Sequence, residues 1–214
     1  EDLEALGQIG RAAAGGLERI AFSPADWAGR RWVAQQMQAL GMTVSTDAAG
    51  NTMGRYPGLV EALPAIALGS HTDTVPQGGV YDGALGVLGG LACIRALHAA
   101  QQRLRHPLVL INFSAEEATM AGGTLGSYAL TGLLNPQVID GEAWDGQLVR
   151  THLQRIGLDP SQLQSAQQPV GSYAAFLELH IEQGATLEAR QLPIGIVEGI
   201  VGIRRYLVTF YGYA

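Results

Sequence analysis

Two continuously apolar segments, separated by a helical pattern, stand out in the middle of the chain. Residues 65–70 (AIALGS) and 107–113 (PLVLINF) have the length and composition of buried strands. A Gly-rich loop at 71–83 and a helical pattern at 84–100 lie between them. This order predicts a strand–helix–strand unit with parallel strands that are covered on both faces.

Periodic patterns on either side predict further elements. Ser23 and Pro24 start a helix, because serine caps and proline suits the first turn, and its apolar periodicity ends near Gly41. Turn residues at 47–51 separate two short strands at 42–46 and 52–56, which predicts a hairpin. The other predicted elements are helices at 3–20, 123–130 and 147–156, a surface loop at 161–170, and strands at 174–181, 194–200 and 203–211. We expect a three-layer α/β/α fold around a mixed, largely parallel sheet.

Composition places the chain among ordinary globular proteins and excludes several partners. It has 214 residues, of which 47% are hydrophobic and 15% are charged, with a net charge of −6. Basic residues are scattered, so we expect neither a nucleic-acid nor a membrane partner. No apolar run reaches the length of a membrane span and no signal peptide is visible, and we expect a cytoplasmic protein. Cys93 is the one cysteine, and we expect it to be a buried, inert thiol.

Acidic and imidazole residues come directly after three of the predicted strands. They are His71 and Asp73, Glu116 and Glu117, and His180 and Glu182, with Asp82 at the end of the Gly-rich loop. In open α/β sheets, ligands bind beyond the carboxyl ends of the strands. We therefore expect these side chains to meet at one edge of the sheet.

This set of donors favours a metal site. Oxygen and nitrogen donors without sulfur suit zinc, or manganese or cobalt, and the acids are too many for one structural zinc. In the adjacent pair Glu116 and Glu117, one residue can bind metal while the other acts as a base. Each residue taken singly also has a structural interpretation; Asp82, for example, could cap a helix. We expect the remaining histidines to be structural or exposed, namely His98, His106 and His152.

Three ordered motifs resemble a known family of enzymes. They are GSHTDTVPQGGVYDGALGVLGGL (69–91), FSAEEATMAGGTLGS (113–127) and LELHIEQG (177–184). They are similar to the motifs of zinc-dependent amidohydrolases with a zinc-aminopeptidase-like fold, which include allantoate amidohydrolases, N-carbamoyl-L-amino-acid hydrolases and β-alanine synthases. The segments at 22–41 and 47–58 also fit, so the resemblance covers nearly the whole chain.

The resemblance implies a two-metal site with two zinc ions, or manganese or cobalt, in each complete active site. His71 and His180 would bind the first ion, Glu117 the second, and Asp82 would bridge the two. The family also suggests a cis peptide bond between Asp82 and Gly83.

Three further roles follow from the same resemblance. Glu116 would be the general base for the attacking water and later the acid for the leaving nitrogen. Asp73 would orient His71, as residues behind metal-bound histidines usually do. Gln183 would contact the substrate, because an amide can both donate to and accept from a ureido group.

Two departures from the family's motifs affect these expectations. The segment after the Glu-Glu pair reads Ala-Thr-Met-Ala at 118–121, where relatives commonly have Gly-x-Arg-Phe. No histidine follows His180, so the second metal site lacks one ligand in this chain. We expect residues 1–203 to be the N-terminal part of a catalytic metal-binding domain and 204–214 to begin a lid or dimerisation domain. A homodimer is the state expected for the full-length protein.

Three functions remain open. The first is a metal-dependent hydrolase of carbamoyl or ureido C–N bonds in small molecules, which HIEQG and GGVYDGALG favour. The second is an aminoacyl or peptide amidohydrolase on the same fold. The third is an inactive, truncated fragment that binds one metal weakly. Whichever holds, we expect the isolated 214-residue chain to aggregate or associate through an exposed sheet edge or apolar face.

Overall fold

The computed structural model describes residues 1–200, 202, 206 and 208–212. They form two compact units, residues 1–181 and residues 182–214, and each is described by itself. In the first unit the helices are α1 (Asp2–Leu6), α2 (Pro24–Ala39), α3 (Ala84–Ala99), α4 (Leu125–Thr131) and α5 (Val149–Arg155), with 3₁₀ helices η1 (Pro136–Asp140) and η2 (Pro160–Ala166). Its strands are β1 (Thr43–Thr46), β2 (Thr52–Tyr56), β3 (Ala65–His71), β4 (Leu108–Phe113) and β5 (Tyr173–Leu177). The second unit contains α6 (Thr186–Ala189).

The strands form one mixed sheet in the order β1-β2-β4-β3-β5. The β1–β2 hairpin is antiparallel and β2 pairs antiparallel with β4, whereas β3 runs parallel to both β4 and β5. The register places His71 beside Phe113, so β3 and β4 end together. This arrangement confirms the predicted strand–helix–strand unit and the predicted fold class.

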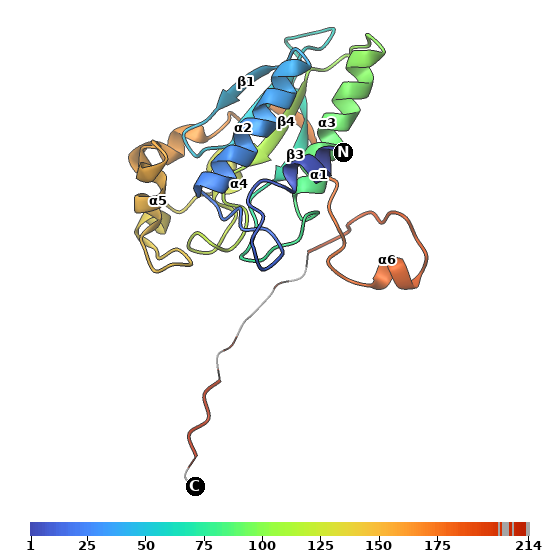
Figure 1. Ribbon diagram of the computed structural model, residues 1–214. Coiled ribbons are helices and arrows are strands. Elements are labelled where there is room, and N and C mark those ends of the chain that lie inside the picture. Colours follow the sequence, from blue (N-terminus) through green and yellow to red (C-terminus); the bar gives the residue numbers. More distant parts are fainter. Residues whose placement is uncertain (201, 203–205, 207, 213–214) are drawn as a thin grey trace. The chain divides into compact units, whose positions relative to one another are not determined.

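Helices cover the two faces of this sheet (Figure 1). On one face, α1, α2 and α3 pack against alternate strand residues such as Leu108 and Leu110. On the other face, Leu130 of α4 packs against Val109 and Ile111. Because β4 contributes apolar side chains to both faces, it lies at the centre of the core, as its unbroken apolar run predicted.

The start of α2 is built as its sequence predicted. Ser23 is the N-cap residue and accepts a hydrogen bond from the main-chain N–H of Asp26. Proline occupies the first turn, and Gly41 follows the helix with a φ of +71°. These local signals fix both ends of the helix, so its position relative to the β1–β2 hairpin is well specified.

Several predicted elements were wrong. The helix predicted at 3–20 is limited to α1, because Gly10, Gly15 and Gly16 take positive φ angles that a helix does not allow. The loop predicted at 161–170 begins with η2, which buries Leu163. Residues 194–200 are not a strand, and no pairing partner for them exists in the described part of the chain. The strand predicted at 203–211 lies partly outside the described residues.

Cys93 is exposed, which corrects the expectation of a buried thiol. It lies on α3, a helix whose apolar residues extend beyond the face that packs on the sheet. The buried side of α3 contains Val87, Leu91 and Ile94, and Cys93 lies on a different side of the helix. Because α3 has apolar residues all round, its sequence did not indicate which side faces solvent.

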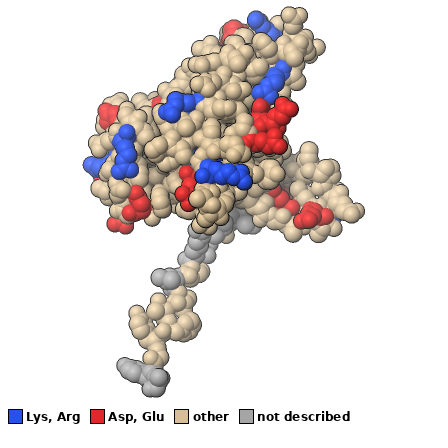
Figure 2. Space-filling model, in the orientation of Figure 1, with Lys and Arg blue, Asp and Glu red and all other residues tan. Residues whose placement is uncertain are grey.

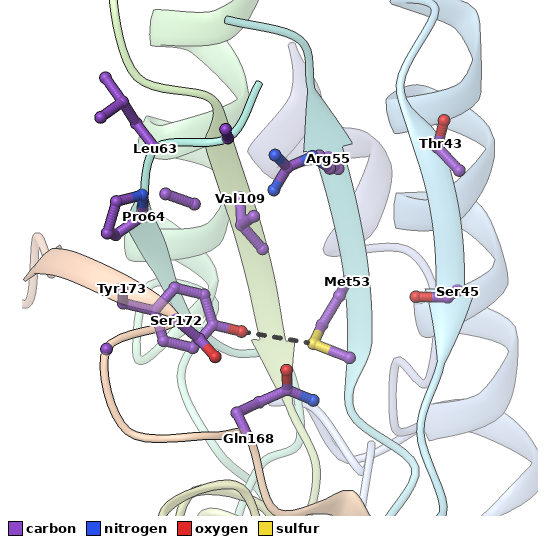
Figure 3. A pocket seen from close by; sticks show the side chains of 13 residues that line it. Thr43, Ser45, Met53, Arg55, Leu63, Pro64, Val109, Gln168, Ser172 and Tyr173 are labelled. Carbon is purple, nitrogen blue, oxygen red and sulfur yellow. Dashed lines mark hydrogen bonds between the residues drawn. The ribbon is translucent and has the colours of Figure 1, made fainter. Parts of the chain in front are cut away.

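On the face shown in Figure 2, arginines are interspersed with acidic side chains. No helix in the described part of the chain is long and apolar enough to cross a membrane. A cavity of about 430 Å³ opens on the sheet beside Met53, Arg55 and Val109 (Figure 3). Ala65 and Tyr173, the first residues of β3 and β5, also line it, so it lies toward the amino ends of the parallel strands.

Candidate metal centre

Three strand ends bring acidic and imidazole side chains together at the carboxyl edge of the parallel strands. His71 is the last residue of β3, Glu116 follows β4, and His180 follows β5. The Nε2 atom of His71 lies 3.6 Å from Oε2 of Glu116 and 3.9 Å from Oδ1 of Asp82. Nε2 of His180 lies 3.2 Å from the same oxygen of Asp82. The structure therefore places these four side chains in one cluster.

The donor atoms fit a metal ion in two overlapping groups. His71, Asp82 and His180 each offer one atom, and these atoms lie within 4.8 Å of one another. His71, Glu116 and Glu117 form a second such group. Two imidazole nitrogens and three carboxylates match the ligands that zinc accepts, and they contain no sulfur. The residues present thus suit one or two zinc-like ions, with Asp82 and His71 at the centre.

Asp73 lies beneath the cluster and is completely buried. Its main-chain carbonyl oxygen lies 3.0 Å from Nδ1 of His71, whereas its carboxylate is 3.6 Å from that nitrogen. The carboxylate instead accepts hydrogen bonds from the main-chain N–H groups of Glu116 and Glu117, at 3.3 and 3.0 Å. One residue therefore contacts both the histidine after β3 and the acidic pair after β4. Its main-chain carbonyl makes the closer contact with His71.

Burial and charge shift the ionisation of this cluster. Burial alone would lower the pKa of His71, but the hydrogen bond and attraction of Asp73, with the charge of Glu116, raise that pKa to about 9. Burial raises the pKa of Glu116 and of Glu117, and the charge of His71 only partly offsets it. Burial would also raise the pKa of Asp73, but its interactions with His71 lower that pKa overall. The acids of the cluster repel one another, and the raised pKa of His71 favours the protonated imidazole among them.

Two local backbone conformations aim the side chains at the centre. Ala115 takes a φ of +47°, which is rare for a residue with a Cβ, and it turns the chain immediately before Glu116. Gly83 takes a φ of +61°, and a Cβ at this position would collide with the ring of His71. The Asp82–Gly83 peptide bond is trans, which corrects the expected cis bond: the positive φ of the glycine makes the turn.

Other residues singled out in the sequence lie elsewhere. Glu182 accepts hydrogen bonds from the main chain at the start of α6, so it has a structural role in the second unit. Gln183 is exposed in that unit, and its contact with substrate stays a prediction. His152 is buried and pairs with Asp145. This structural setting agrees with what was expected of His152.

Sequence reasoning missed a buried cation beneath the site. Arg30 of α2 is 2% exposed and pairs with the buried Asp26. A signal was available, because Asp26, Arg30, Val33 and Met37 are spaced as one face of a helix. Two charged residues on the same stripe as core residues indicate a buried ion pair.

A cavity of about 320 Å³ adjoins Glu116. Its walls include Phe113 and Phe176, whose rings contact edge to face, and Glu178. The hydroxyl of Ser70 donates to Glu178 over 2.5 Å. The cluster thus has a partly apolar space beside its candidate base, in contrast to the larger cavity at the opposite end of the strands.

Comparison with known proteins agrees with this geometry. The family model described as peptidase family M20/M25/M40 matches residues 67–213. The chain is 37% identical to an N-carbamoyl-L-amino acid amidohydrolase of Geobacillus stearothermophilus over 98% of this chain and 51% of that protein. It is 36% identical to a ureidoglycolate hydrolase of Arabidopsis thaliana, over 98% of this chain and 46% of that protein. The chain therefore spans about half the length of the curated relatives it matches.

A solved structure shares the fold. A hydantoinase/carbamoylase family amidase from Burkholderia ambifaria superposes with a TM-score of 0.79 at 35% sequence identity. The match covers 88% of this chain and 46% of that protein.

Proposed function

The chain belongs to peptidase family M20/M25/M40, and we propose that it holds the metal-binding residues of a hydrolase that cleaves carbamoyl or ureido C–N bonds in small molecules. The convergence of His71, Asp82, His180 and the Glu116–Glu117 pair at one sheet edge is the observation on which this proposal rests. Relatives named for N-carbamoyl amino acids and ureidoglycolate support this substrate class over peptides.

The cluster would hold two zinc ions, or manganese or cobalt. His71 and His180 would be the nitrogen ligands, Glu117 would be a carboxylate ligand, and Asp82 would be the carboxylate shared between the ions. When bound, such ions polarise the scissile carbonyl and make water a better nucleophile at neutral pH.

Glu116 is the group that moves the proton. Its side chain is 37% exposed, so water and substrate can reach it, and Oε2 lies close to the centre of the cluster. The carboxylate accepts a proton from the water whose oxygen attacks the carbonyl carbon. It returns that proton to the nitrogen as the C–N bond breaks, and an amine or ammonia leaves.

Asp73 and the main chain keep these groups in place. Asp73 holds the main chain of both glutamates while its carbonyl contacts His71, so ligand and base keep a fixed separation. Gln183 would contact the ureido group of the substrate. We further propose that the protein is cytoplasmic and that its full-length form is a homodimer.

Turnover by the zinc-loaded protein tests this proposal. N-carbamoyl-L-amino acids, allantoate and ureidoglycolate are offered beside dipeptides, and Glu116→Gln is the matched inactive variant. Release of ammonia or amine from the carbamoyl or ureido compounds, lost in Glu116→Gln, is the expected result. Cleavage of dipeptides alone would favour the aminoacyl or peptide amidohydrolase. No turnover of any substrate would favour a fragment that binds metal without catalysis.

A further inference from the structure

We propose that Arg30 is a positioning residue for the metal centre, and that its guanidinium group holds the Glu116–Glu117 segment in register with His71. This inference rests on the proposed metal site and adds to it a residue that lies one layer below the ligands. Arg30 belongs to α2, which contributes no ligand of its own. Its effect on the metal would therefore pass entirely through the groups it holds.

The guanidinium group of Arg30 joins three segments of the chain. Its Nε lies 3.0 and 3.1 Å from the two carboxylate oxygens of Asp26, one turn earlier in α2. Its Nη1 donates to the carbonyl oxygens of Gly50 and Asn112, each at 3.2 Å. Its Nη2 donates to the carbonyl oxygen of Phe113 over 2.6 Å. Both terminal nitrogens thus bind main-chain oxygens at the end of β4.

These contacts lead directly to the proposed ligands. Phe113 is the last residue of β4, and the chain turns at Ala115 to present Glu116. Nη2 of Arg30 also lies 3.9 Å from the carboxylate of Asp73. That carboxylate accepts the main-chain N–H groups of both glutamates. Arg30 and Asp73 therefore hold the acidic segment from its two sides.

The cost of burying these charges argues for a role beyond stability. Asp26, Arg30 and Asp73 are at most 2% exposed, and a buried ion pair is often no more stabilising than apolar residues of the same size. A second buried cation, Arg19, donates to the carbonyl oxygen of Thr72, between His71 and Asp73. Buried charge is thus concentrated directly behind the candidate ligands.

A lysine cannot reproduce what Arg30 does. The planar guanidinium presents five N–H donors in a fixed fork, whereas an ammonium group on a flexible stem is a single point with three donors. In place of Arg30, a lysine would keep the positive charge between Asp26 and Asp73. It would lose the simultaneous contacts with Asn112 and Phe113. Arg30→Lys therefore separates geometry from charge.

Zinc binding and unfolding, measured on the same variants, test the inference. Zinc alone is the probe, and its affinity is measured by competition with a chromophoric chelator, well below the unfolding temperature. We expect Arg30→Lys and Arg30→Met to fold and to lose zinc affinity by roughly tenfold or more. The absorption bands of bound cobalt should also shift, because they report the ligand geometry.

Two control variants lie on the same helix. Val33→Ala removes a buried core side chain that makes no contact with the site, so it should lower the unfolding temperature and leave zinc affinity within about twofold of wild type. Arg31→Met changes an exposed arginine beside Arg30 and should alter neither property. Val33→Ala shows whether lower stability alone weakens zinc binding. Arg31→Met shows whether the loss of a nearby positive charge alone weakens it.

Each outcome is decisive. Zinc affinity and cobalt bands that stay at wild-type values in Arg30→Lys and Arg30→Met would overturn the inference and leave the metal site standing. If Arg30→Met does not fold, Arg30→Lys decides. If neither folds, Arg30 serves the fold itself and the inference fails. Absence of zinc binding by the wild-type chain would instead overturn the proposed function, and this inference with it.

Discussion

Gly83 lies between a candidate ligand and the start of α3, in a conformation open to few residues. Its φ is +61°, and the ring of His71 occupies the space where a Cβ would be. Asp82, immediately before it, reaches both histidines of the cluster. The conformation of this one residue therefore affects both the backbone turn and the packing of the metal centre.

Replacing this glycine tests how tightly the centre is built. Gly83→Ala should lower the free energy of unfolding by roughly 1–3 kcal/mol and weaken zinc binding, because the added methyl group must displace the turn or His71. Gly79→Ala is the matched control, since a Cβ there would meet open space. Chemical denaturation and zinc competition measure both effects. Equal behaviour of the two variants would contradict the close packing around His71.

Sequence alone predicted most of the side chains that meet, although Glu182, also expected there, belongs to neither donor group. His71, Glu116 and His180 need only the rule that parallel strands end at a common edge. The roles assigned to them stay predictions until metal binding is measured. The support beneath them was predicted only in part: the resemblance implied that Asp73 would orient His71, whereas Arg30 was missed because its contacts are with residues far along the chain.

At the element scale, local signals decided which predictions succeeded. The β1–β2 hairpin and the helices α2 and α3 have strong turn or cap residues and clear periodicity, and each was found close to its predicted place. The helix predicted at 3–20 ends at Leu6, because three of the four glycines in that range take positive φ angles. For residues 194–200 the strand pattern was present, but a strand also requires a neighbour to pair with.

The segment between η1 and α5 offers a test of a charge interaction away from the site. Asp145 accepts a hydrogen bond from the N–H of Gln147 and contacts His152 on α5. Burial acts to raise the pKa of Asp145, but the interactions with Gln147 and His152 together lower that pKa. A lowered carboxyl pKa means that the ionised form favours the folded state.

The effect of Asp145→Asn should therefore depend on pH. The variant should unfold about 1–2 °C below wild type at neutral pH, because Asp145 is largely exposed and its interactions are screened. The stabilisation is present above the unfolded-state pKa of Asp145 and is lost as pH falls through the lowered folded-state value. Calorimetry from pH 7 down to pH 3 measures the difference, and the exposed Glu142→Gln is the control. A difference in unfolding temperature between wild type and Asp145→Asn that grows as the pH falls would contradict the prediction.

At the scale of the whole molecule, the sheet presents one edge strand with apolar side chains. β5 is the last strand of the sheet, and Leu177 at its end is 59% exposed. Edge strands with exposed apolar residues tend to pair with other chains. The predicted domain boundary after residue 203 stays a prediction, because several residues around it lie outside the described part of the chain.

We expect the 214-residue chain to associate through this edge. Leu177→Lys should reduce association, because a charged residue on an edge strand disfavours strand pairing. Leu59→Lys changes a leucine that is 71% exposed and lies away from the sheet edge, and it should leave association as it is. Light scattering over several days measures both. A wild-type chain that stays monomeric throughout would contradict the expectation.

Zinc stoichiometry tests the central claim most directly. Equilibrium dialysis of the chain, followed by metal analysis, should find at least one zinc per chain in the wild type. His71→Ala should weaken binding by at least ~100-fold, because it removes the ligand shared by both candidate groups. His98→Ala changes an exposed histidine on α3 and should bind zinc as the wild type does. Absence of zinc from the wild-type chain, or zinc retained equally by His71→Ala, would contradict a metal centre at this sheet edge.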